Sequence, residues 1–121
     1  MQGQFISSSS GDGFALIRVE FPHDLSPAEQ EQAVTELLAA GDEAAEPMVV
    51  LDLGGMDAAY SRFLGALLSL RRQQRRRGGR VLLAAVAPLV VQTLERCGLN
   101  VMFEFFPTVE AALEAVEARP V

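Results

Sequence analysis

The sequence predicts a single α/β domain over residues 1–121, with a mainly parallel sheet of four to five strands, an N-terminal hairpin and about four helices. Two almost continuous apolar runs, Val49–Leu53 and Arg80–Ala87, have the composition of strands buried on both faces. Segments with apolar residues at helical spacing alternate with these strands, as crossovers between parallel strands require. Half of the 121 residues are apolar, which is enough for a core.

The N-terminal residues predict the hairpin. Phe5 and Ile6 begin an edge strand, Ser10–Gly13 is a turn signal, and Phe14–Phe21 alternates in part as a second strand does. A helix follows after Leu25, because Ser26, Pro27 and Glu29 have the pattern of a capping box with proline at the first helical position. We expect Gly41 to end this helix.

The central segment predicts a buried strand, a loop and a helix. Gly54 and Gly55 are expected to break the strand, and Ser61 opens a run in which apolar residues recur at helical spacing. Ser61 is placed where a hydroxyl caps free backbone N–H groups. The first turn of a helix also favours an anionic group, so a phosphate on Ser61 would suit this position electrostatically.

The C-terminal third predicts two more helices and a strand. Pro88 begins a helix that ends at Gly98 and turns Cys97 inward as a buried, inert thiol. Val101–Phe106 is predicted to be a strand, and Thr108 is predicted to cap the last helix.

Composition excludes several classes of function. The net charge of −6 disfavours binding to nucleic acid, and no apolar run is long enough to span a bilayer. We find no secretory signal and expect a cytoplasmic protein. One histidine, His23, and one cysteine far from it do not make a metal site, and Ser61, His23 and Asp24 lack the glycines of a nucleophile elbow. We therefore predict no enzyme active site, no metal and no cofactor.

Three segments together resemble the STAS domain, the fold of anti-sigma-factor antagonists. Val49–Leu53 and the later Leu64–Leu68 resemble the family's strand and helix around Asp-Ser-Ser-Gly-Leu-Gly. Arg76–Leu83 resembles its helix end, glycines and next strand, and Pro88–Leu113 resembles its closing helix, strand and helix. The resemblance implies a non-enzymatic module that docks on an anti-sigma factor with serine kinase activity, is released when a serine is phosphorylated, and is reset by a phosphatase.

On this resemblance Ser61 falls at the phosphoacceptor position, but the residues around it depart from the family pattern. Tyr60, Arg62 and Phe63 replace the family's aspartate, second serine and glycine. Two interpretations of Ser61 stay open, a switch and a helix cap. The candidate partner-binding residues are Asp24, Asp57, Tyr60, Ser61, Arg62 and Phe63.

Six arginines between Arg71 and Arg80 form a basic patch, which is interpreted as a solvated helix end or as a site for an anionic partner. Two further functions stay open beside the antagonist. They are an accessory subunit of a lipid or solute transporter, and a constitutive stressosome-like scaffold. Self-association as a homodimer would use the edge strand or the Phe103–Phe106 segment.

Overall fold

A computed structural model describes residues 2–118 and shows an α/β fold with five strands and four α-helices in that range. The elements, in chain order, are β1 (Ile6–Gly11), β2 (Phe14–Glu20), α1 (Pro27–Glu43), β3 (Met48–Gly55), α2 (Ser61–Arg76), β4 (Arg80–Ala84), α3 (Pro88–Arg96), the 3-10 helix η1 (Asn100–Met102), β5 (Glu104–Phe106) and α4 (Val109–Glu117).

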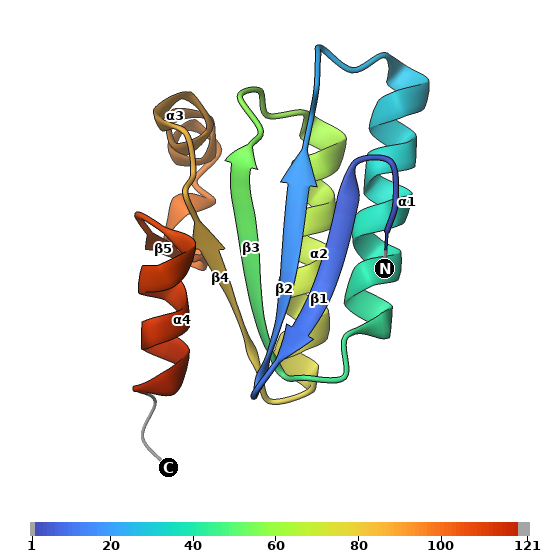
Figure 1. The fold of residues 1–121 in the computed structure, drawn as a ribbon. Coiled ribbons are helices and arrows are strands. Elements are labelled where there is room, and N and C mark those ends of the chain that lie inside the picture. Colours follow the sequence, from blue (N-terminus) through green and yellow to red (C-terminus); the bar gives the residue numbers. More distant parts are fainter. Residues whose placement is uncertain (1, 119–121) are drawn as a thin grey trace.

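The five strands form one sheet in the order β1-β2-β3-β4-β5 (Figure 1). β1 and β2 are antiparallel, and every other neighbouring pair is parallel. A two-residue turn at Asp12 and Gly13 joins the hairpin, and Gly13 has a φ of +82°, which a glycine adopts without strain. The predicted mainly parallel sheet with an N-terminal hairpin is confirmed.

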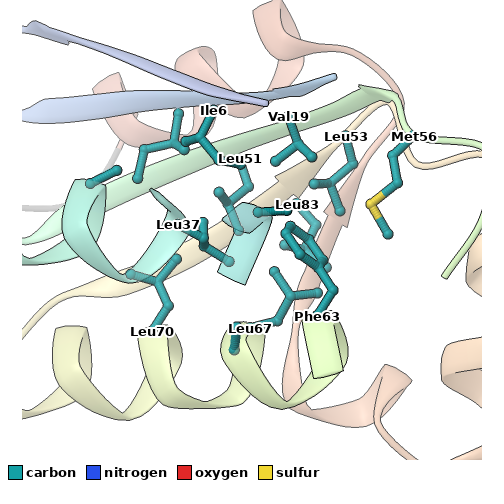
Figure 2. Packing of buried hydrophobic residues seen from close by; sticks show 14 of the residues in the cluster. Ile6, Val19, Leu37, Leu51, Leu53, Met56, Phe63, Leu67, Leu70 and Leu83 are labelled. Atoms are coloured by element: carbon teal, nitrogen blue, oxygen red, sulfur yellow. The ribbon is translucent and has the colours of Figure 1, made fainter. Parts of the chain in front are cut away.

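Helices cover both faces of the sheet, so the central strand β3 buries alternate side chains on opposite sides. Val49, Leu51 and Leu53 belong to the larger core cluster, which α1 and α2 close from one side. Figure 2 shows Leu37 of α1 and Leu67 and Leu70 of α2 packed toward Leu51 in this cluster. On the other face, Met48 and Val50 pack with Ala112 of α4.

Local signals in the sequence place three helix starts correctly. Ser26 and Glu29 make both hydrogen bonds of the capping box, and Pro27 is the first residue of α1. Pro88 is the first residue of α3. The Thr108 hydroxyl accepts a hydrogen bond from the Ala111 N–H at 3.0 Å and caps α4.

Three predicted boundaries are wrong. α1 continues through Gly41, which is buried where α1 meets α2: a Cβ there would lie 2.6 Å from Leu70 Cδ1. β3 includes Gly54 and Gly55 instead of stopping before them, and the Gly55 carbonyl accepts a hydrogen bond from the Phe21 N–H at 2.9 Å. β4 ends at Ala84, three residues earlier than expected.

The segment Val101–Phe106 is also not a single strand. Its first residues belong to η1, and only Glu104–Phe106 pair with β4. This correction matters because Val101 and Met102 are exposed as a result.

Cys97 is exposed, so the prediction that its side chain is buried is wrong. It is the C-terminal cap residue of α3, and that helix turns only Val90 and Leu94 fully into the core.

Candidate functional site

The predicted partner-binding residues gather where β2 and β3 end and α1 and α2 begin (Figure 1). Parallel strands that are joined by helices place their carboxyl ends, and the starts of the following helices, at one edge of the sheet. Two loops form this edge, residues 21–26 between β2 and α1 and residues 56–60 between β3 and α2. We call this edge the switch surface.

Four aromatic rings lie beneath the switch surface. Phe21, at the start of the first loop, contacts Phe63 edge-on, with ring centroids 5.3 Å apart, and Tyr60 at 5.8 Å. Phe5 of the N-terminal segment contacts Phe21 at 6.2 Å. Phe63 is only 1% exposed and lies in the core (Figure 2). The prediction that Phe63 contacts a partner does not fit this position, because its side chain supports the surface from below.

Tyr60 joins the two loops. Its hydroxyl accepts a hydrogen bond from the backbone N–H of Leu25 at 2.8 Å, and its half-buried ring packs on Phe21. Leu25 is itself buried. The tyrosine that departs from the family pattern therefore has an internal role, because it holds the loop before α1 against the start of α2.

Ser61 is the first residue of α2 and does not cap it. The N-cap position belongs to Tyr60, whose side chain makes no capping hydrogen bond, so the prediction of a Ser61 cap is wrong. The physical reason is that Ser61 is already inside the helix, one residue after the N-cap position from which a side chain reaches the free N–H groups of the first turn. Ser61 is exposed, at the end of a helix whose first N–H groups lack a side-chain acceptor.

The remaining predicted residues add exposed charges to the switch surface. Arg62 reaches across to α1, where its Nη1 lies 3.5 Å from Glu31 Oε1, and both side chains are exposed. Asp24 and Asp57 are exposed on the two loops. The switch surface thus carries a hydroxyl, one arginine and two aspartates above an apolar base.

His23 pairs with the capping box of α1. Its Nε2 lies 3.1 Å from Glu29 Oε2, while Glu29 Oε1 accepts the Ser26 N–H. The hydrogen bond from the Ser26 backbone, together with His23, holds the pKa of Glu29 below its ordinary value. Within residues 2–118, no group of three or more His, Cys, Asp or Glu side chains is placed to hold a metal ion.

The arginines of the basic patch lie at the opposite end of α2 and differ in their partners. Arg77 donates to the carbonyl of Gly41 in the last turn of α1 at 3.3 Å and to that of Ala44, the C-terminal cap residue of α1, at 2.6 Å. Arg80 forms a two-pronged ion pair with Glu104, and this hydrogen bonding raises the pKa of Arg80. Arg71 donates from Nε to the Met102 carbonyl at 2.6 Å.

Sequence reasoning missed Glu36, a buried carboxylate on α1. Its Oε1 accepts the N–H groups of Phe5 at 2.8 Å and Ile6 at 3.0 Å, and Oε2 accepts the Gln32 side chain at 2.7 Å. Glu36 thereby fixes the N-terminal segment on α1. A glutamate among other helical glutamates carries no local signal of this contact, which joins residues about thirty positions apart.

The Phe103–Phe106 segment offers little apolar surface for self-association. Phe103 is buried, and Phe105 and Phe106 pack against the two core clusters. No helix in the described part of the chain has the length and apolar character that a membrane crossing requires.

The STAS domain family model matches residues 16–112. Among solved structures, the chain is similar to an anti-sigma-factor antagonist (STAS) domain protein from Planctomyces limnophilus, with a TM-score of 0.81, 25% identity, and coverage of 93% of this chain and 98% of that one. It also has the fold of the anti-sigma factor antagonist SpoIIAA in its unphosphorylated form, with a TM-score of 0.74, 19% identity and coverage of 96% and 99%. A sulfate transporter family protein from Wolinella succinogenes matches with a TM-score of 0.74, 16% identity and coverage of 87% and 85%. No curated protein matches the chain.

Proposed function

Because the chain belongs to the STAS domain family, we propose that it is a regulatory protein–protein interaction module that acts as an anti-sigma-factor antagonist. Its partner in this proposal is an anti-sigma factor with serine kinase activity in the cytoplasm, and a phosphatase reverses the modification. The docking site is the switch surface, with Asp24, Asp57, Tyr60 and Arg62 around Ser61, and Ser61 is the phosphoacceptor.

The observation that carries the proposal is the position of Ser61. It is exposed, it is the first residue of α2, and the helix end beside it has no side-chain cap. A kinase therefore reaches the hydroxyl without displacing a capping hydrogen bond. Phosphorylation would also leave the helix intact, because the free N–H groups of the first turn favour an anion.

Phosphorylation at this point would change the charge of the surface. A phosphoserine adds nearly two negative charges to a surface that already carries Asp57 and the exposed pair of Arg62 and Glu31. Inside a docked interface these charges lose their water and repel any acidic group of the partner. In the free module the phosphate has the helix end and Arg62 as stabilising neighbours. Modification thus favours release.

The test is capture of partners from the native cytosol with wild type, Ser61→Ala and Ser61→Asp, read by mass spectrometry. We expect an anti-sigma factor kinase to bind wild type and Ser61→Ala and to be lost with Ser61→Asp. Ser69→Asp is the matched control, because Ser69 is exposed on the same helix but two turns away from its start. If Ser69→Asp releases the kinase as completely as Ser61→Asp, a negative charge anywhere on α2 weakens binding of the kinase. The proposal that Ser61 is the switch is then refuted.

The same captures separate the two alternatives. Recovery of a transporter subunit with all three variants would favour the transport accessory role. Recovery of a large assembly of copies of this chain, in the same amount with wild type and with Ser61→Asp, would favour the stressosome-like scaffold. Incubation of the purified chain with the captured kinase and ATP then shows whether phosphate is added to Ser61 or to another residue.

A further inference from the structure

We propose that the hollow between the second half of α2 and η1, here named the arginine groove, binds an acidic segment of a partner protein that also carries an apolar side chain. The hollow has a volume of about 380 Å³ and is lined by Leu68, Arg71, Arg72, Arg75, Arg76 and Met102. A second hollow of about 220 Å³ shares Arg71, Arg75 and Met102 with it, continues along Val101 to the Arg80–Glu104 pair, and forms part of the arginine groove.

The charge of the groove is not neutralised by the rest of the described chain. Arg72, Arg75 and Arg76 are exposed and have no acidic partner within residues 2–118. Arg77, by contrast, donates to carbonyls at the C-terminal end of α1, and Arg80 pairs with Glu104. The dipole of a helix stabilises cations within its last turn, and the last turn of α2 contains Arg75 and Arg76. It does not contain Arg72, so the dipole leaves the charge of Arg72 uncompensated.

The groove also has an apolar wall. Val101 is 83% exposed and Met102 is 37% exposed, and they are two of the three large hydrophobic residues exposed in the described chain. Arg71 holds η1 in place through its hydrogen bond to the Met102 carbonyl, so the apolar wall has a defined position beside the arginines. An exposed apolar wall next to unpaired cations is complementary to a segment with both carboxylates and an apolar anchor.

Charge selects a protein segment over a nucleic acid or a membrane. The guanidinium group matches a carboxylate with two parallel hydrogen bonds, so a short acidic segment satisfies the three arginines. A long polyanion or an anionic bilayer would also face the remainder of a chain whose net charge is −6.

The arginine groove is separate from the switch surface. Ser61 and Arg75 stand fourteen positions apart on one helix, which corresponds to roughly 21 Å along its axis. A segment in the groove therefore leaves Ser61 uncovered, and the two sites are testable independently.

The test uses fluorescence anisotropy with the full chain and a fluorescein-labelled peptide of glutamates and leucines. Arg75→Glu is compared with Arg96→Glu, because both arginines are exposed in the last turn of a helix but only Arg75 lines the groove. We expect Arg75→Glu to weaken binding by about fivefold and Arg96→Glu to leave it near wild type. Val101→Ser should weaken binding of this peptide but not of a peptide with serines in place of the leucines.

Four results would overturn the proposal. One is the absence of binding to wild type, and another is an equal loss with Arg75→Glu and Arg96→Glu, which would reveal attraction to overall charge alone. The third is tighter, Arg75-dependent binding of a single-stranded oligonucleotide or of phosphatidylserine vesicles. The last is concentration-dependent self-association that Arg75→Glu abolishes, because the occupant would then be a second copy of this chain.

Discussion

Tyr60→Phe removes one hydroxyl and leaves the aromatic ring in place. The hydroxyl accepts the Leu25 N–H at 2.8 Å, and this partly buried donor loses its acceptor in the variant. A net intramolecular hydrogen bond is worth about 1 kcal/mol, and an unsatisfied donor costs toward 3 kcal/mol only when water is excluded. Because the loop is partly open to water, we expect the free energy of unfolding to fall by about 1 kcal/mol.

Urea unfolding followed by circular dichroism measures this change. An unaltered slope of the free energy of unfolding against urea concentration is the evidence that the fold is intact. Tyr60→Ala serves as the comparison, because it also removes the ring contact with Phe21 and should cost about 2 kcal/mol more for a half-buried ring. Hydrogen exchange at the Leu25 amide should accelerate in both variants. An unchanged exchange rate at Leu25, together with wild-type stability of Tyr60→Phe, would refute the role of the hydroxyl in joining the two loops.

Three further predictions concern stability. Burial raises the pKa of Glu36, but hydrogen bonds from Gln32 and from backbone N–H groups outweigh it and hold the pKa below its ordinary value of 4.5. The stabilisation by this carboxylate is therefore present above the unfolded pKa and is lost as the pH falls through the folded pKa. We expect Glu36→Gln to be less stable than wild type at neutral pH, and the difference in the free energy of unfolding to shrink below about pH 4.5. Urea titrations of both proteins at several pH values measure this difference. Gly65→Ala should stabilise the protein by about 0.8 kcal/mol, because Gly65 is an exposed position of α2 and nothing lies within 4 Å of the added methyl group. Gly41→Ala should instead cost about 1 kcal/mol in thermal unfolding, because its methyl group would lie 2.6 Å from Leu70 Cδ1, and equal effects of the two substitutions would contradict the close approach of α1 and α2.

Much of the fold was predictable because its signals are local. The capping box at Ser26, the proline at the start of α3 and the Thr108 cap each act within one turn of backbone. The apolar run from Val49 to Leu53 predicts a strand covered on both faces, since burial on both faces leaves no polar alternation. The errors occur where a distant contact overrides a local preference, as at Gly41, where the close approach of Leu70 explains a glycine inside a helix.

The candidate site was predictable only in part. The position of Ser61 at the start of α2 follows from the helical spacing of the residues after it, but its hydroxyl is not the cap. Phe63 is a core residue that shares the buried face of α2 with Leu67 and Leu70, and this helical spacing is the local signal that could have placed it there. The exposure of Val101 and Met102 could not be predicted locally, because an apolar run that suits a strand forms a 3-10 helix instead.

The sequence by itself determined the class of fold, the order of its strands and helices, the family resemblance and the serine at the start of α2. These features depend on periodicity, on turn residues and on caps, all of which act over a few residues. Only the tertiary structure decided that Tyr60 holds the loop before α1, that Glu36 fixes the N-terminal segment, and that three arginines beside an apolar wall lack acidic partners within residues 2–118. Each of these depends on which distant side chain occupies the neighbouring space, and no local pattern specifies that.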